Sequence, residues 1–301
     1  MEKLIVSSAE INMRLDTFLV QKIKSVTRSK IQKSIKTGEI TVNEKSVSPH
    51  YKVKEGQVVI FSIPKNNKIG LKPVNRQSYR VVDEDDDYLI IDKPAGLLVH
   101  PDGIHDEVTL INELLYKYPK IKLVGDNQIR PGIVHRLDRE ASGVMVVAKN
   151  SITYDHLKTQ FQKRLVKKEY YAVVYGTPDK NSGEITFSII RSRHHPNRMA
   201  ARPDKSGRQA YTSYVVVKNL NNKSLLRIST KTGRTHQVRV HLFAINHPIV
   251  GDNIYYPKSK RRAVIDRLLL HAHYLEFKDH HGVVRKYSCP PPAPEELWLN
   301  P

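Results

Sequence analysis

The chain has 301 residues, a formal net charge of +20 at pH 7 and one cysteine, Cys289. The length allows one large domain with a smaller one attached, and a single cysteine excludes an internal disulfide. There is no run of about 18 apolar residues, as a membrane helix needs, and no apolar signal segment near Met1. We therefore expect a soluble cytoplasmic protein without membrane contact, and the positive charge predicts a polyanionic partner such as a nucleic acid.

Residues 14–62 have the pattern of a compact basic module. The spacing of Leu15 and Leu19 predicts a short helix with one apolar face. A second helix is predicted to end at Gly38, and a strand follows at 40–43. The outer face of the second helix carries four basic residues, which are Arg28, Lys30, Lys33 and Lys36.

Residues 64–78 are rich in Pro, Asn and Lys, include Gly70 and hold no acidic residue, which predicts a linker. Beyond it, two strands are predicted on either side of five successive acidic residues at 83–87. A bound cation needs ligands that converge from chosen spacings, and this run lacks such spacing. We therefore expect a solvated turn at 83–87, followed by a helix over 110–118.

A dense run of charged side chains at 135–140 lies between Gly132 and Gly143. The apolar, β-branched run at 144–148 predicts a buried strand directly after it. Loops that a rigid strand holds are where binding and catalytic groups concentrate. A charged hairpin whose side chains pair in solvent is the alternative, and spacing alone leaves both interpretations open.

The second half of the chain alternates between basic helices and strands. Leu157, Phe161 and Leu165 predict the inner face of a helix whose other faces are basic. Antiparallel hairpins with a basic loop are predicted over 184–218, and a last helix is predicted to begin near Thr235.

Fourteen histidines raise the question of a metal site. The pairs at 194–195, 271–273 and 280–281 are not joined to Cys or Glu at zinc spacing. The sequence also lacks a phosphate-cradling glycine loop and a nicotinamide fingerprint. We therefore expect neither a metal nor a cofactor.

The segment His-Arg-Leu-Asp-x-x-x-Ser-Gly at 135–143 resembles the signature of the RluA family of RNA pseudouridine synthases. In that family the Asp is the catalytic residue, which here implies Asp138. The family has Thr at the position of Ala141, a departure that removes a hydroxyl and leaves the carboxylate. The same resemblance implies that Arg136 fills the gap left by a flipped base.

Four further segments resemble that family and stand in its order: Asp-Lys-Pro-Ala-Gly at 92–96, Lys-x-Tyr-x-Ala-x-Val at 168–174, Gly-Arg-Thr-His-Gln-x-Arg-x-His at 233–241 and His-Pro-Ile-x-Gly-Asp at 247–252. The resemblance implies that Tyr170 packs against the target base. It also implies that Arg234 forms an ion pair with Asp138.

The first module resembles the S-four RNA-binding domain, a family that binds structured RNA through a basic helix face. This implies that the four basic residues of the second helix contact RNA. The expected domains are an S-four-like domain at 12–63, a linker at 64–78 and a pseudouridine synthase catalytic domain at 79–301. The expected fold class is α+β, with a curved, mixed, mostly antiparallel sheet in the larger domain and a cleft across its middle.

Together these resemblances imply a cofactor-independent RNA pseudouridine synthase, an isomerase that flips a uridine into its cleft. The attached S-four domain favours 23S large-subunit ribosomal RNA as the substrate, with transfer RNA as an alternative. A non-catalytic RNA-binding or ribosome-assembly protein is a rival, but it has no need for Asp138, Tyr170 and Arg234 together. A phosphodiester hydrolase is a second rival, but it needs a metal cluster. We expect a monomer.

Overall fold

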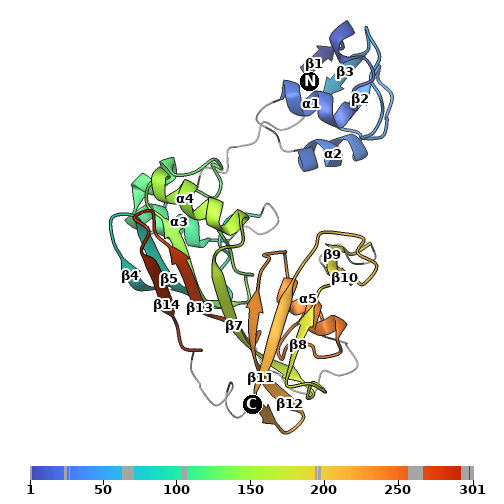
Figure 1. The fold of residues 1–301 in the computed structure, drawn as a ribbon. Coiled ribbons are helices and arrows are strands. Elements are labelled where there is room, and N and C mark those ends of the chain that lie inside the picture. The colour runs from blue at the N-terminus through green and yellow to red at the C-terminus, as the bar shows by residue number, and fades with distance from the viewer. Residues whose placement is uncertain are drawn as a thin grey trace. The chain divides into compact units, whose positions relative to one another are not determined.

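The chain divides into two compact units, Met1–Gly70 and Leu71–Pro301 (Figure 1). The computed structural model describes residues 2–23, 26, 28–62, 71–102, 107–193, 195, 198–256, 267–292 and 298, with Ser29, Lys30, Lys33 and Leu220 described by their backbone alone. None of the helices in these stretches is both long and apolar enough to cross a membrane.

The first unit contains a three-stranded antiparallel sheet in the order β1-β3-β2. Its elements are β1 Glu2–Ile5, the 3-10 helix η1 Ser8–Glu10, α1 Leu15–Lys22, α2 Arg28–Lys36, β2 Ile40–Val42 and β3 Val58–Phe61. Leu15 and Leu19 are buried on the inner face of α1, as their spacing predicts. Gly38 follows α2 with a φ of +77°, which glycine adopts without strain, so it ends the helix as expected.

The second unit is built on a nine-stranded sheet in the order β4-β5-β6-β13-β7-β12-β11-β8, with β14 paired to β13. Among the described strands of this sheet, only β6 and β13 pair in parallel. The strands are β4 Arg80–Glu84, β5 Tyr88–Lys93, β6 Ser142–Ala148, β7 Lys167–Tyr175, β8 Ser182–Ile185, β11 Thr212–Leu220, β12 Lys223–Thr230, β13 Leu270–Lys278 and β14 Val284–Ser288. The expected α+β class with a mixed, mostly antiparallel sheet is therefore confirmed.

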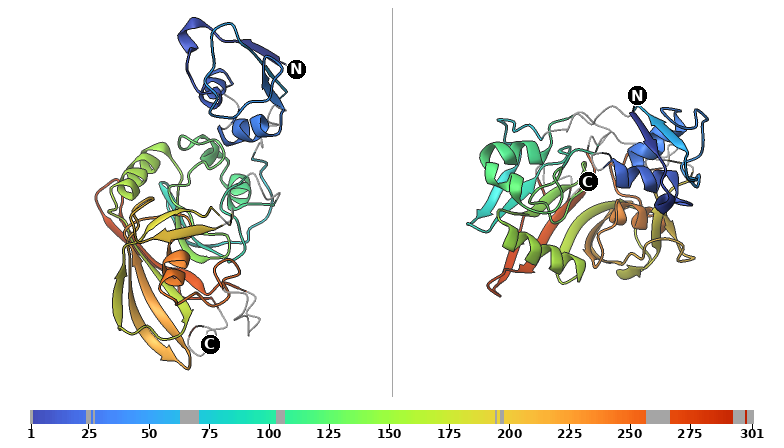
Figure 2. Two further views of the ribbon diagram at one scale, coloured as in Figure 1. Left: turned by 90° about the vertical axis from the view of Figure 1, so that its right-hand side faces the viewer. Right: turned by 90° about the horizontal axis from the view of Figure 1, so that it is seen from above.

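The helices of this unit lie in two groups along the sheet. They are α3 Leu110–Lys117, the 3-10 helix η2 Pro119–Leu123, α4 Ser151–Gln162 and α5 Gln237–Ala244, and a separate hairpin is formed by β9 Ser188–Arg191 and β10 Met199–Arg202. The helices α3 and α4 lie over the part of the sheet that begins with β4. In contrast, α5 lies with the β9–β10 hairpin over the part that ends with β8 (Figure 1; Figure 2).

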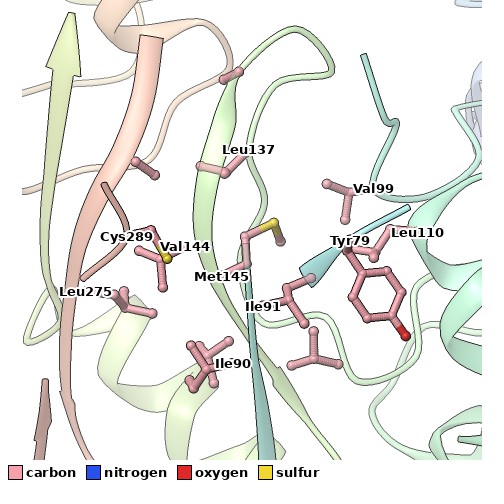
Figure 3. Packing of buried hydrophobic residues seen from close by; sticks show 14 of the residues in the cluster. Tyr79, Ile90, Ile91, Val99, Leu110, Leu137, Val144, Met145, Leu275 and Cys289 are labelled. Carbon is pink, nitrogen blue, oxygen red and sulfur yellow. The ribbon is translucent and has the colours of Figure 1, made fainter. Parts of the chain in front are cut away.

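The strand β6 is buried along its whole length near the middle of the sheet. Its Val144 and Met145 pack with Ile91 of β5 and Leu275 of β13 (Figure 3). Leu137, from the charged loop that precedes β6, enters the same core. The charged loop is therefore anchored at its centre by an apolar side chain and at its end by the best-buried strand of the unit.

The segment 71–78, which the composition predicts to be part of a linker, is attached to the second unit. The backbone N–H of Val74 donates to the Asn112 carbonyl at 2.9 Å. The backbone N–H and the hydroxyl of Ser78 both donate to the Glu113 carboxylate at 2.8 Å. These contacts fix the segment to α3. Residues 64–70 of the predicted linker lie outside the described residues.

The helix predicted around Leu157 and Phe161 is α4, but its bounds differ from the prediction. It begins at Ser151, where the Asn150 side chain caps it by accepting the Thr153 N–H at 2.9 Å. It ends at Gln162, so Leu165 is not on its inner face and is 62% exposed. The physical reason is that Arg164 adopts a left-handed conformation, with a φ of +60°, which turns the chain toward β7.

Gly143 is required where β6 and β13 pair in parallel. Its φ is +122°, and a Cβ built on it would lie 2.2 Å from the carbonyl oxygen of Ala272 in β13. No side chain fits into that distance without moving one of the two strands.

We predict that Gly143→Ala destabilises the protein more than Gly282→Ala. Gly282 has a similar left-handed φ of +88°, but a Cβ there would meet nothing within 4 Å. The control variant measures the conformational cost alone, whereas Gly143→Ala adds overpacking worth about 1–3 kcal/mol. Urea unfolding of the two variants tests this difference, and equal losses would contradict the steric argument.

Candidate active site

A cavity of about 730 Å³ in the second unit brings together four residues that the sequence singles out. Arg136 and Asp138 come from the loop before β6, Tyr170 comes from β7, and Arg234 comes from the segment between β12 and α5. The sequence segments that carry them are far apart in the chain, and the sheet places them around one space.

Lys93, a fully buried lysine at the end of β5, holds the Asp138 loop. The ammonium of Lys93 donates to the carbonyls of Pro94 at 2.8 Å, Leu97 at 2.9 Å and Arg139 at 3.1 Å. Burial lowers the pKa of Lys93 to about 7, and the nearby Asp138 carboxylate opposes that shift. Three carbonyl acceptors satisfy all three protons of the ammonium, so Lys93 fixes the loop to the turn after β5.

His135 also fixes this loop, through contacts with β6 and α4. Its Nε2 accepts the backbone N–H of Val146 at 3.0 Å, and its ring stacks on Phe161 of α4 with a centroid distance of 4.6 Å. Burial lowers the pKa of His135 to about 3, so the imidazole is neutral at physiological pH. Its lone pair is occupied by the β6 backbone, so His135 positions the loop and has no free nitrogen on that side to accept a proton.

Asp138 is paired with an arginine other than the one expected. Among the described residues, the cation within ion-pair distance of its carboxylate is Arg239, with Nη1 3.5 Å from Oδ2. Arg234 makes no such contact, so the expected ion pair between Arg234 and Asp138 is wrong. The two arginines lie in the same sequence segment, but Arg239 lies within α5, 1% exposed, while Arg234 precedes the helix.

Arg239 is itself held in place by Asp252, from the His-Pro-Ile-x-Gly-Asp segment. Its Nε and Nη2 donate to the two carboxylate oxygens of Asp252 at 2.8 and 2.9 Å, and its Nη1 also reaches Glu140 at 3.2 Å. Burial alone would raise the pKa of Asp252, but the hydrogen bonds from Arg239 outweigh it and hold that pKa below its usual value. The guanidinium therefore has a fixed orientation toward Asp138.

Arg234 lies at the cavity wall and contacts backbone groups. Its Nε donates to the carbonyl of Gln209 at 3.1 Å, and its backbone N–H donates to the side-chain oxygen of Gln237 at 3.1 Å. Burial lowers the pKa of Arg234, and the neighbouring Arg208 and Arg164 lower it further. A guanidinium among other cations is a site that favours an anion.

Tyr170 presents an aromatic ring to the same cavity as Asp138. Burial raises the pKa of Tyr170 to about 12, and the charge of Asp138 adds to the shift. The side chain is therefore a neutral phenol at physiological pH and cannot act as a strong base. It offers an apolar, flat surface next to a carboxylate.

Arg136 is exposed and reaches across the cavity mouth, where its Nη2 donates to the Thr235 hydroxyl at 3.3 Å. It is one of several cations around the cavity that, among the described residues, have no carboxylate within ion-pair distance: Arg130, Arg136, Arg164, Lys168, Lys231 and Arg234. Burial lowers the pKa of Lys168 to about 8. The cavity therefore combines the Asp138 carboxylate, the Tyr170 ring and a cationic rim.

In the first unit, Arg28 of α2 makes a structural contact with the fully buried Asp16 of α1. The Asp16 carboxylate is bound by the guanidinium of Arg28 at 3.2 Å, by that of Arg14 at 2.9 Å and by the amide of Gln32 at 2.6 Å. Burial would raise the pKa of Asp16, but these three donors lower it. Lys36 is exposed, and the side chains of Lys30 and Lys33 lie outside the described residues.

Sequence reasoning missed Arg239, Asp252 and Lys93. All three lie in segments that resemble the family, so the signal was present, but the segments do not reveal which side chains point toward Asp138. The inward direction of Arg239 follows from its position within α5, and the role of Lys93 follows from carbonyls that only the folded chain brings together.

We predict that His135→Gln makes the stability of the protein less dependent on acid pH. The unfolded chain binds a proton at His135 near pH 6.5, whereas the folded chain does so near 3. The contribution of neutral His135 is therefore complete above pH 6.5 and is lost as pH falls toward 3, with a slope of about 1.4 kcal/mol per pH unit. Glutamine keeps an acceptor for the Val146 N–H and does not titrate. Denaturant unfolding between pH 4 and 7 should give a flatter profile for the variant, and parallel profiles would contradict the prediction.

Comparison with known proteins agrees with this geometry. Residues 87–244 match the family model described as RNA pseudouridylate synthase, and residues 13–59 match that of the S4 domain. The chain is similar to an uncharacterized RNA pseudouridine synthase of Aquifex aeolicus, with 40% identity over 82% of this chain and 78% of that protein. It is also similar to the ribosomal large subunit pseudouridine synthase D of Blochmanniella floridana, with 37% identity over 84% of this chain and 78% of that protein.

A solved structure supports the same assignment. The human RNA pseudouridylate synthase domain containing 1 superposes with a TM-score of 0.62 and 26% identity, covering 75% of this chain and 89% of that one. The family model covers the Asp138 loop, β7 and α5, each of which contributes residues to the cavity wall. The chain therefore belongs to the RNA pseudouridine synthase family of isomerases and carries an S4 domain at its N-terminal end.

Proposed function

We propose that this enzyme isomerises uridines of large-subunit ribosomal RNA, with Asp138 as the catalytic carboxylate and the target base flipped into the cavity. The observation that carries the proposal is the position of Asp138: it faces the cavity beside Tyr170 and is oriented by the buried pair of Arg239 and Asp252. An ionised carboxylate in that position is the group that the reaction requires.

The chemistry needs no oxidant and no added group. The bond between N1 of uracil and C1′ of ribose breaks, a bond between C5 and C1′ forms, and the proton on C5 is lost while one is gained at N1. Asp138 acts either as a nucleophile at C1′ or as a base toward the ribose, and both routes use the ionised carboxylate. Arg239 keeps that carboxylate directed into the cavity.

Binding of the base rests on Tyr170 and on the cationic rim. A uridine inside a helix is out of reach, so the nucleotide has to leave the stack and enter the cavity. Stacking on an aromatic face contributes about 1–3 kcal/mol per base, and Tyr170 offers that face. In this proposal Arg136, which is exposed at the cavity, occupies the gap in the RNA helix, while Arg234 and Lys168 attract the flanking phosphates.

The S4 unit supplies a second RNA contact in this proposal. Its exposed basic residue Lys36, with Lys30 and Lys33 on the same helix, binds the phosphate backbone and leaves the choice of uridine to the catalytic unit. Arg28 contributes less to this contact, because its guanidinium is occupied by Asp16.

The choice of ribosomal RNA rests on relatives. The similar proteins of Blochmanniella floridana and Haemophilus ducreyi are each named ribosomal large subunit pseudouridine synthase D. Transfer RNA is the competing substrate, and the two are separated by experiment. The cytoplasm, where ribosomal RNA is modified in bacteria, is the proposed location.

We predict that Asp138→Asn abolishes isomerisation and leaves RNA binding nearly unchanged. The amide keeps the size of the side chain but cannot act as a nucleophile or as a base. Tritium release from RNA labelled at C5 of uridine measures turnover, and a filter-binding assay measures affinity. Asp155→Asn, on the exposed face of α4, is the matched control and should keep full turnover. Turnover by the Asp138 variant would refute its catalytic role.

We also predict that a strain without this enzyme loses specific pseudouridines from 23S ribosomal RNA. Mapping pseudouridine in ribosomal and transfer RNA from the deletion strain, and from the strain complemented with the Asp138→Asn variant, identifies the sites. Loss confined to transfer RNA would reject the ribosomal target while leaving the reaction itself in place.

A further inference from the structure

Two turns outside the cavity bring an aspartate and two histidines together. Asp87 lies in the turn between β4 and β5, at the end of the acidic run, and His280 and His281 lie in the turn between β13 and β14. The sequence suggests a solvated turn for the first and no zinc spacing for the second, because neither segment holds a full ligand set. Folding makes them neighbours, and none of the three residues lines the cavity.

The distances suit a small divalent ion. The Oδ2 atom of Asp87 lies 3.6 Å from Nδ1 of His280 and 3.7 Å from Nε2 of His281. The donor atoms of all three residues lie within 4.8 Å of one another. In a tetrahedral zinc site with bonds of 2.0–2.1 Å, neighbouring donor atoms are about 3.4 Å apart. Small shifts of the side chains therefore suffice to bring the three donors to bonding distance.

Both turns are held by other contacts. The second oxygen of Asp87, Oδ1, accepts the side-chain amide of Asn150 at 2.8 Å, which leaves Oδ2 directed at the histidines. Asp279 accepts the backbone N–H groups of His281 at 3.0 Å and Val283 at 2.9 Å, and so fixes the histidine turn. Such outer contacts orient metal ligands in known sites.

The two histidine rings are also close to each other. The His280 and His281 rings lie 3.9 Å apart, centroid to centroid. One ion can therefore reach a nitrogen of each ring together with an oxygen of Asp87.

We propose that Asp87, His280 and His281 form a binding site for a divalent transition-metal ion, with Zn²⁺ as the best match. Two nitrogen donors and one carboxylate are the ligands that Zn²⁺ accepts, whereas Ca²⁺ and Mg²⁺ prefer oxygen alone. His281 is 67% exposed at its side chain, so the remaining positions of the ion are open to water. The ion ties the β4–β5 turn to the β13–β14 turn and thereby stabilises the folded sheet.

The test uses the full chain without an affinity tag, stripped of metal and titrated with ZnCl₂ by calorimetry and thermal unfolding. We expect binding at this site and a rise in Tm with Zn²⁺ concentration. The double variant His280→Gln/His281→Gln should lose at least about 100-fold in affinity. Asn150→Ser keeps a good helix cap but removes the amide donor to Asp87, and should lose about 10–100-fold.

His195→Gln is the matched control, because it removes an exposed histidine elsewhere in the second unit. It should bind Zn²⁺ with the affinity of the unchanged protein. Binding that survives the double variant, or that is absent from the unchanged protein, would overturn the proposal. Neither result bears on the isomerase reaction, since the site is separate from the cavity.

Discussion

The buried pair of Arg239 and Asp252 is the interaction on which the active site depends. Removing two charges from water is costly, and the cost is offset only when every polar group is satisfied. Asp252 meets this condition with two bonds from the guanidinium and further bonds from the backbone N–H groups of Ile254 and Tyr255. The result is a guanidinium whose remaining nitrogen, Nη1, is directed at the carboxylates of Glu140 and Asp138.

The sheet provides the rest of the geometry. Because β6 is buried along its whole length, the end of the loop that leads into β6 is fixed. The buried side chain of Leu137 fixes the centre of the same loop. Lys93 and His135 then hold the loop by hydrogen bonds to the Arg139 carbonyl and from the Val146 N–H, respectively. Four independent contacts of different kinds therefore act on a loop of a few residues, which is how a charged, irregular segment keeps one conformation.

Individual helices and strands could be predicted because the local spacing of apolar residues determines each of them. The helix around Leu15 and the strand at 144–148 follow from the spacing of apolar residues, whereas the α+β class was implied by the family resemblance. The resemblance indicated the segments that surround the cavity, but it assigned the ion pair with Asp138 to Arg234, whereas Arg239 forms it, because the direction of each side chain depends on where α5 begins. Leu165 was misplaced because a left-handed Arg164 ends the helix, and Asp87 and His280 meet only through the order of the strands.

The close contact at Gly143 limits how this enzyme can change over evolutionary time. Since β6 and β13 leave no space for a methyl group between them, a substitution in one strand is tolerated only with a compensating shift of the other. The residues of the rim, in contrast, lie on loops and strand ends, so each can be substituted without moving a strand of the sheet. A new RNA preference in this family is therefore expected to arise from substitutions at the rim, while the pairing of β6 with β13 stays the same.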